Sequence, residues 1–203
     1  MEFNKKEWTG NWVNFEKYIY STEAAMQQCW AEAEEAAKAM PMFKRGVKSF
    51  WKMACNTIAP GNPVRLGGWK VSDSGDGIEI EWLDEKGTSL GSSVYACREI
   101  IARGLEGKEN YLLEAREVSD NWPFRYVLAM EPTPSREDKA TGSLLSHFHF
   151  QYAGSRKNLL KEDGTLADPM WYGTMCDGDG TLLDECNIVR ALHKMKTWEK
   201  LPE

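Results

Sequence analysis

The stretch from Gly77 to Arg98 reads GIEIEWLDEKGTSLGSSVYACR, and its pattern decides the predicted fold. Apolar and polar residues alternate over Gly77–Leu83 and again over Ser92–Arg98, and the segment DEKGTS between the two runs is typical of a turn. In a β-strand, successive side chains point to opposite faces, so each run predicts a strand with one buried face. The stretch therefore predicts two antiparallel strands that are joined by a short connection.

The same two-residue period recurs on both sides of this stretch, separated by segments rich in Gly, Asp, Asn and Ser. The further runs are Trp69–Val71, Tyr111–Glu117, Phe124–Met130 and Ser143–Gly154. Strands that are spaced this regularly and joined by short turns predict an antiparallel meander that closes as a barrel or packs as a sandwich.

Apolar residues recur instead at three- and four-residue spacing over Thr22–Ala39, Phe43–Ile58 and Leu183–Lys200, which predicts three helices. The expected fold is mainly β (α+β): an antiparallel β-barrel with two N-terminal helices and a C-terminal helix. We expect one domain in three parts, which are a helical part (1–62), a barrel (63–182) and a closing helix (183–203).

Composition narrows the classes of function. The 203 residues are 42% hydrophobic and 28% charged, which is typical of a globular chain. The net charge of −6 and the absence of a basic run argue against a nucleic-acid partner. No window of 18 apolar residues predicts a membrane span, and the N-terminus shows no apolar signal-peptide region. Five scattered cysteines without a CxxC pair favour a reduced, cytoplasmic compartment, although a processed exported form would look the same.

The stretch from Ser143 to Gly154, SLLSHFHFQYAG, contains two of the three histidines of the chain. His147 and His149 are two residues apart, so a strand places both imidazoles on one face, about 6.5–7 Å apart along the backbone. Two neutral imidazoles at this spacing can converge on one zinc, copper or nickel ion. Histidine pairs in strands are more often structural, so the pattern by itself leaves both readings open.

A metal site needs at least one more ligand from elsewhere in the chain. The candidates are Glu131, Glu137, Asp138, His193 and Cys176. Glu131 ends the preceding predicted strand, which would bring it beside the histidines if the two strands pair. The DGDG segment at residues 177–180 lacks the later ligands of an EF-hand calcium loop, so we interpret it as a turn into the last helix.

Three blocks of the sequence resemble the ZinT (YodA) zinc-binding family. LLSHFHFQYAGSRKNLLKE (144–162) resembles the segment around that family's S-H-F-H signature, and WTGNWVNFEKYI (8–19) resembles its tryptophan-containing opening. SVYACREIIARGLEGKENYLLEAREVSDNWPFRYVLAMEP (93–132) resembles its run of three strands. The similarity extends from Trp8 to about Leu160. Only S-H-F-H is a specific motif.

The resemblance implies a calycin-like (lipocalin-type) barrel with a zinc site at one mouth, formed by three histidines. Two of them correspond to His147 and His149. Where the third belongs, this chain reads Met130-Glu131-Pro132, so Glu131 is the predicted replacement, with Asp138 as the alternative. The family's His-rich N-terminal segment and export signal are absent, which agrees with a cytoplasmic relative that has a remodelled site.

Three functions follow as hypotheses. The first is binding of zinc, or of another divalent transition metal, through His147, His149 and Glu131. The second is binding of a small molecule in a barrel cavity that is lined by Trp and Phe side chains. The third is an enzyme of unknown reaction in which one histidine is a general base. We expect a metal ion or a small molecule as partner, whereas the sequence leaves the oligomeric state open.

Overall fold

Eight antiparallel strands form a closed barrel in the computed structural model, which describes residues 3–59 and 64–202. Each strand pairs with the next along the chain, and β1 pairs with β8 to close the barrel. The strands are β1 (Gly10–Asn14), β2 (Leu66–Asp73), β3 (Ile78–Asp84), β4 (Ser89–Ile101), β5 (Asn110–Ala115), β6 (Tyr126–Met130), β7 (His147–Ala153) and β8 (Gly173–Asp177). The predicted antiparallel barrel is confirmed.

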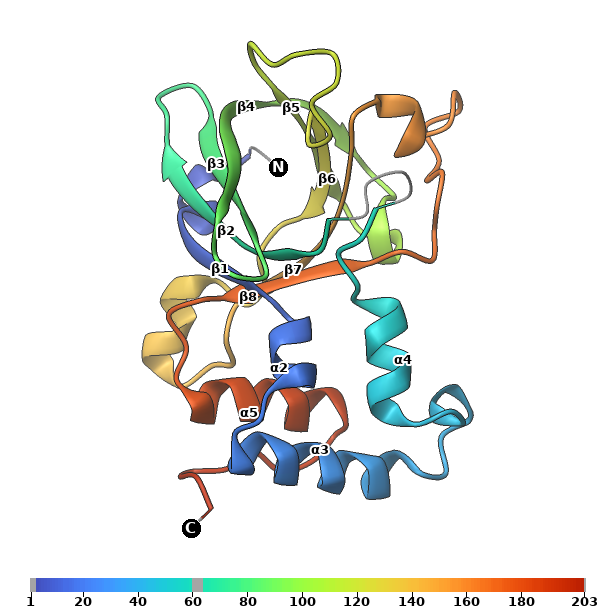
Figure 1. Ribbon diagram of the computed structural model, residues 1–203, viewed down its shortest axis with the longest axis vertical. Coiled ribbons are helices and arrows are strands. Elements are labelled where there is room, and N and C mark those ends of the chain that lie inside the picture. The colour runs from blue at the N-terminus through green and yellow to red at the C-terminus, as the bar shows by residue number, and fades with distance from the viewer. Residues whose placement is uncertain (1–2, 60–63, 203) are drawn as a thin grey trace.

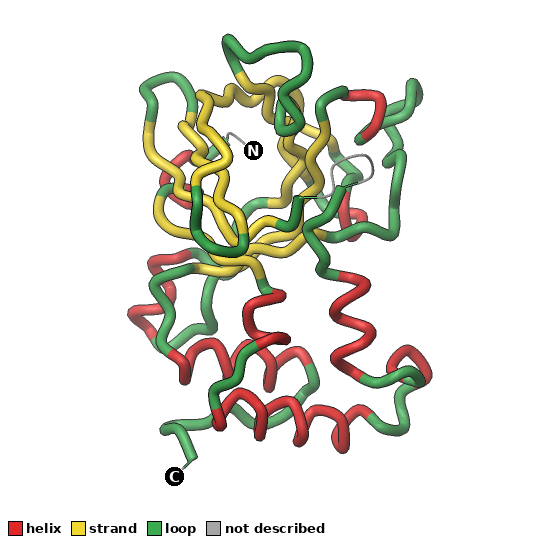
Figure 2. The backbone as a smooth tube through the Cα atoms, in the orientation of Figure 1, coloured by secondary structure: helices red, strands yellow, loops and turns green. Residues whose placement is uncertain are grey.

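The barrel lies above a layer of helices, and β7 and β8 form the part of its wall that faces this layer (Figures 1 and 2). The layer consists of α2 (Glu16–Tyr20), α3 (Ala24–Ala37), α4 (Val47–Ala54) and α5 (Leu182–Leu192), whereas α1 (Lys5–Trp8) packs against the barrel. Short 3₁₀ helices are η1 (Pro41–Phe43), η2 (Leu105–Gly107), η3 (Arg136–Thr141) and η4 (Arg156–Asn158). No helix of the described residues is long and apolar enough to cross a bilayer.

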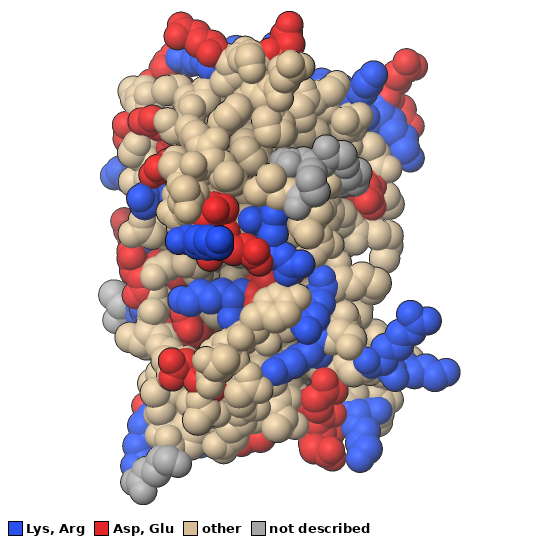
Figure 3. All heavy atoms as spheres, in the orientation of Figure 1, with Lys and Arg blue, Asp and Glu red and all other residues tan. Residues whose placement is uncertain are grey.

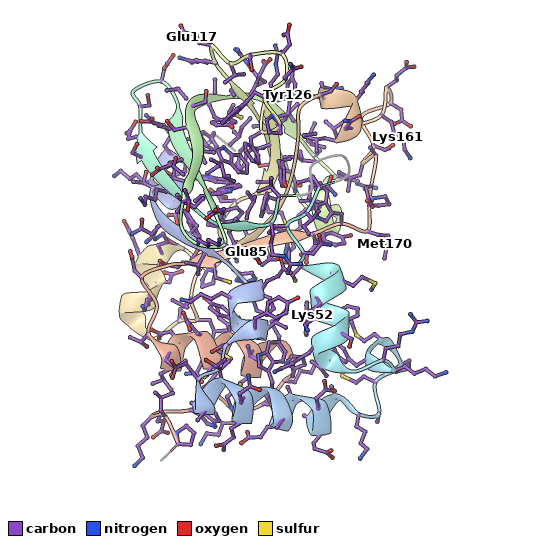
Figure 4. All side chains as sticks on the ribbon, viewed as in Figure 1. Lys52, Glu85, Glu117, Tyr126, Lys161 and Met170 are labelled. Atoms are coloured by element: carbon purple, nitrogen blue, oxygen red, sulfur yellow. The ribbon has the colours of Figure 1, made fainter. Side chains whose placement is uncertain are left out.

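Aromatic side chains fill the inside of the barrel (Figure 4). Trp69 lies against Phe148 and Phe150, with ring centroids 5.3 and 4.7 Å apart, and Trp82 stacks on Phe124 at 4.2 Å. An eight-stranded barrel has an interior just wide enough for side chains to fill, and large rings fill it here. The predicted Trp and Phe lining therefore forms a packed core.

Local signals in the sequence define the ends of the helices. Thr181 and Asp184 form a capping box at the start of α5, which satisfies backbone N–H groups that the first turn leaves free. The carboxylate of Glu34 in α3 accepts hydrogen bonds from the first backbone N–H groups of α4, at Val47 and Lys48. Asp177 of the DGDG segment ends β8, and the rest of the segment is the predicted turn into α5.

Several elements differ from the sequence-based expectation, and helices α1 and α2 were not predicted. The barrel also takes β1 from the part predicted to be helical (1–62), and β8 was not predicted as a strand at all. The last helix ends at Leu192, well before Lys200, because Lys194 adopts a left-handed backbone conformation with φ of 58°. Met195 and Trp198, which suggested a longer helix, pack from the segment beyond it onto the helical layer.

Acidic and basic side chains are interspersed over the face of the molecule drawn in Figure 3. Many of them pair with each other, as Arg65 does with the buried Glu16 at 2.6 Å. On this face, charges of both signs therefore lie near one another.

Candidate functional site

His147 and His149 project from the outer surface of the barrel wall, toward the helical layer. Phe148 and Phe150, which alternate with them along β7, point into the barrel core. The predicted sharing of one face by the two imidazoles is confirmed. The family resemblance implied a site at the barrel mouth, whereas the pair lies in the seam between the barrel and the helices.

Strand β8 provides the neighbours of both histidines. His147 lies opposite Cys176, and His149 lies opposite Thr174. Asp177 N–H donates to Ser146 O at 2.8 Å, so Ser146 and Asp177 form a hydrogen-bonded pair. The pairs alternate along an antiparallel ladder, so both histidine pairs are of the non-hydrogen-bonded kind, in which facing side chains lie closest.

Thr174 holds the ring of His149 in place. Its Oγ1 lies 2.8 Å from His149 Nδ1 and 3.0 Å from the carbonyl oxygen of Tyr172. A hydroxyl group both donates and accepts, so this contact fits either neutral tautomer of the ring. Because Nδ1 is occupied by Thr174, Nε2 is the ring nitrogen that faces Glu106.

The carboxylate of Glu106 faces Nε2 of His149. Glu106 Oε1 and His149 Nε2 are 3.2 Å apart. The other oxygen of Glu106 lies 2.9 Å from Lys108 Nζ. The hydrogen bond with His149, and then Lys108, lower the pKa of Glu106 to about 2, so it is a carboxylate at neutral pH.

A tight turn between β4 and β5 presents Glu106 to the histidine. Gly104 N–H donates to Lys108 O at 2.7 Å, and Glu106 has φ of 55° in the left-handed region. That conformation costs a residue with a side chain roughly 1–2 kcal/mol. Strained residues of this kind cluster at functional sites, where surrounding contacts hold them in place.

His147, like His149, is half-buried. Its Nδ1 atom is buried and has no hydrogen-bond partner among the described residues. Burial, followed by the neighbouring His149, lowers the pKa of His147 to about 4. The ring is therefore neutral at physiological pH, which is the form that binds metal ions.

A cavity of about 180 Å³ connects these groups. It lies between the barrel wall, the β4–β5 turn and helices α4 and α5. The side chains that could bind a metal ion come from β7, β8, the β4–β5 turn and the end of α4. The residues that line it are Phe15, Trp51, Cys55, Glu106, His147, His149, Thr174, Cys176, Ile188 and Leu192.

Glu131 does not line this cavity. Strands β6 and β7 pair as expected, with Ala129 opposite Phe150. Ala129 points into the barrel core, and Glu131, two residues further on, shares its side of the wall. Burial, followed by Glu7 and Glu109, raises the pKa of Glu131. The structure thus brings together His147 and His149 and places Glu131 on the opposite face of the sheet.

Of the other candidate ligands, three lie outside the cavity. Glu137 and Asp138 lie in η3. His193 does not line the cavity either, and both of its ring nitrogens have partners, Trp51 Nε1 at 2.9 Å and Val189 O at 2.7 Å. Cys176 does line the cavity. Glu106 is the acidic residue that the sequence analysis missed, because the GLEGKEN segment indicated only a turn.

Within residues 3–59 and 64–202, no three His, Cys, Asp or Glu side chains are close enough together to hold a metal ion as they stand. His149 and Glu106 are in contact, whereas the ring centroids of His147 and His149 are 6.1 Å apart. The donor types nevertheless suit a transition metal, since the cavity combines two imidazoles with a carboxylate.

Comparison with protein-family models, curated proteins and solved structures finds no match to this chain.

Proposed function

We propose that the protein binds a divalent transition-metal ion, with zinc as the expected ion, through His147, His149 and Glu106. Glu106 takes the role that the sequence analysis assigned to Glu131. We further propose that the chain is a divergent relative of the ZinT family with a calycin-like barrel, because its histidine pair lies on a strand of a closed antiparallel barrel.

The observation that carries the proposal is the contact between His149 Nε2 and Glu106 Oε1. The ring nitrogen and the carboxylate oxygen are 3.2 Å apart, so they share one hydrogen in a hydrogen bond. A metal ion that takes the place of this hydrogen would bind both atoms, with the proton released on binding. Thr174 Oγ1 would then accept from Nδ1–H and hold the ligating ring.

The separation of the two atoms suits a metal ion. Zinc binds imidazole nitrogen at about 2.0–2.1 Å and carboxylate oxygen at about 2.0–2.2 Å, and tetrahedral angles then separate neighbouring donors by about 3.3–3.5 Å. His149 and Glu106 therefore need to move little to share an ion. Thr174 is the outer partner that holds the ligating ring, as second-shell groups commonly do.

His147 must approach for a third bond. Its ring is neutral, and its Nδ1 has no protein partner among the described residues, so little is lost when the ring turns toward an ion. A buried nitrogen without a partner is itself unfavourable, and coordination relieves that cost. A fourth position can be taken by water or by another ligand, since the cavity of about 180 Å³ exceeds the volume of one ion and one water.

The two alternative hypotheses have less support. A ligand inside the barrel would have to displace packed rings such as Trp69 and Phe150. A histidine-dependent reaction would need an activated nucleophile. Burial raises the pKa of Cys55 to about 12 and raises that of Cys176 as well, so both thiols of the cavity are protonated and weakly nucleophilic.

The proposal is tested by isothermal titration of zinc into chelator-treated protein, alongside a His147→Ala/His149→Ala double variant. We expect one zinc per chain in the parent protein and no specific binding in the variant, with both proteins giving the same circular-dichroism spectrum. Equal zinc binding by the parent and the folded double variant would contradict the proposal.

A further inference from the structure

Cys176 faces the same cavity as the two histidines. It lies directly opposite His147 in the pairing of β7 with β8. The side chains of a non-hydrogen-bonded antiparallel pair have Cβ atoms about 4.5–5.5 Å apart, so its sulfur reaches the space beside the imidazole. The register therefore brings a sulfur donor next to the one histidine that has a buried nitrogen without a partner.

A second thiol lines the cavity from the helical side. Cys55 follows α4 directly and is 2% exposed, and Cys176 is fully buried. Both are free thiols. A buried cysteine is often only a small apolar side chain. Here, however, two thiols border a cavity that also holds two imidazoles and a carboxylate, which is a donor set for a soft or borderline ion.

We propose that the cavity selects a thiophilic transition-metal ion, with Cys176 as a thiolate ligand beside His147. This inference rests on the proposed metal-binding function and specifies its ligand class. Thiolate and imidazole together favour zinc, cobalt and copper over magnesium, calcium and manganese, which prefer oxygen donors.

Coordination requires no redox chemistry. The S–H bond of Cys176 breaks, a sulfur–metal bond forms, and the thiol proton passes to the solvent. Cys55 comes from the end of α4, and its thiol contacts the Thr174 side chain, so we assign it to the wall and not to the ligand set.

The test is titration of chelator-treated, reduced protein with Co²⁺, followed by absorption spectroscopy. A cobalt–thiolate bond produces an intense charge-transfer band in the near ultraviolet, which nitrogen and oxygen ligands do not give. The weaker bands in the visible range indicate cobalt in any tetrahedral site. We expect both kinds of band in the parent protein. We also expect Mg²⁺ in excess to leave both unchanged.

Three serine variants locate the ligand. Cys176→Ser should lose the charge-transfer band, whereas Cys55→Ser and Cys97→Ser should keep it. Cys97 is a suitable control because it lies on β4 and does not line the cavity. Loss of the band in Cys55→Ser alone would overturn the assignment of Cys176 as the ligand.

The spectrum of the parent protein keeps the test decisive even if Cys176→Ser fails to fold. Cobalt binding with visible bands and no charge-transfer band would overturn the thiolate ligand and leave the proposed function intact. No cobalt bands at all, together with no heat of zinc binding, would contradict the proposed function itself.

Discussion

His149 Nε2 and Glu106 Oε1 lie 3.2 Å apart, within hydrogen-bond distance. The hydrogen bond with His149 and the neighbouring Lys108 keep Glu106 ionised, so its carboxylate presents a negative charge to the cavity. This relationship links residues from the β4–β5 turn and from β7, and it is the basis of the metal-binding proposal.

Replacing Glu106 by glutamine tests its role as a ligand. The amide has nearly the same shape but no negative charge, so we expect Glu106→Gln to weaken zinc binding by more than about tenfold, since loss of an outer-shell partner alone commonly has that effect. Glu131→Gln is the matched control, because Glu131 lies on the opposite face of the sheet, and its affinity should equal that of the parent. Competition with a chromogenic chelator measures both. Equal affinities in the two variants would remove Glu106 from the site.

Replacing Thr174 by valine tests the orientation of His149. Valine keeps the shape of the side chain and removes the hydroxyl that lies 2.8 Å from Nδ1, so the ring loses the contact that fixes its orientation. We expect zinc affinity to fall by about 10–100-fold, as is usual for second-shell changes, with little change in thermal stability. Thr165→Val in an exposed loop should have no effect. An unchanged zinc affinity in Thr174→Val would show that the ring is held by other contacts.

The low pKa of His147 predicts a specific acid sensitivity of the metal-free protein. The folded-state pKa is about 4 against an ordinary value of 6.5, so between these values the unfolded chain binds the extra proton. Stability is therefore retained above about pH 6.5 and is lost as the pH falls toward 4. A pKa lower by about 2.5 corresponds to a loss of about 3 kcal/mol.

Urea unfolding of metal-free protein at several pH values between 7 and 4 measures this loss, with His147→Gln as the comparison. The variant lacks the titrating ring, so its stability should depend less on pH over the same interval. Glu106 affects stability at lower pH than His147 does. Its pKa is lowered from 4.5 to about 2, so its stabilising contribution is lost only as the pH falls through that range. Parallel pH profiles for the parent and His147→Gln would contradict the assignment.

The sequence predicts six of the eight strands and misses β1 and β8. Gly77–Leu83 and Ser92–Arg98 alternate because one side faces the barrel core and the other faces solvent. All five residues of β8 are buried, since one face packs in the core and the other against the helices, so the strand shows no alternation. β1 is short and continues directly into α2, and its aromatic residues gave no clear period.

For the candidate site, the sequence predicts what lies within one strand and not what the tertiary structure brings to it. The alternation of β7 correctly places His147 and His149 on one face. The same rule, applied from Ala129, places Glu131 on the other face, so proximity along the chain was a poor guide there. Glu106 is 43 residues from His149 along the chain. Its contact depends on the register of β4 with β5 and on a left-handed turn, which no local pattern encodes.

The most direct test of the central claim is the location of the ion. Crystals of zinc-loaded protein, measured on both sides of the zinc absorption edge, would show the ion as an anomalous difference peak. We predict one peak in the cavity between β7 and helices α4 and α5, within bonding distance of His149 Nε2 and a Glu106 carboxylate oxygen. A zinc peak elsewhere on the molecule, with this cavity empty, would contradict the account.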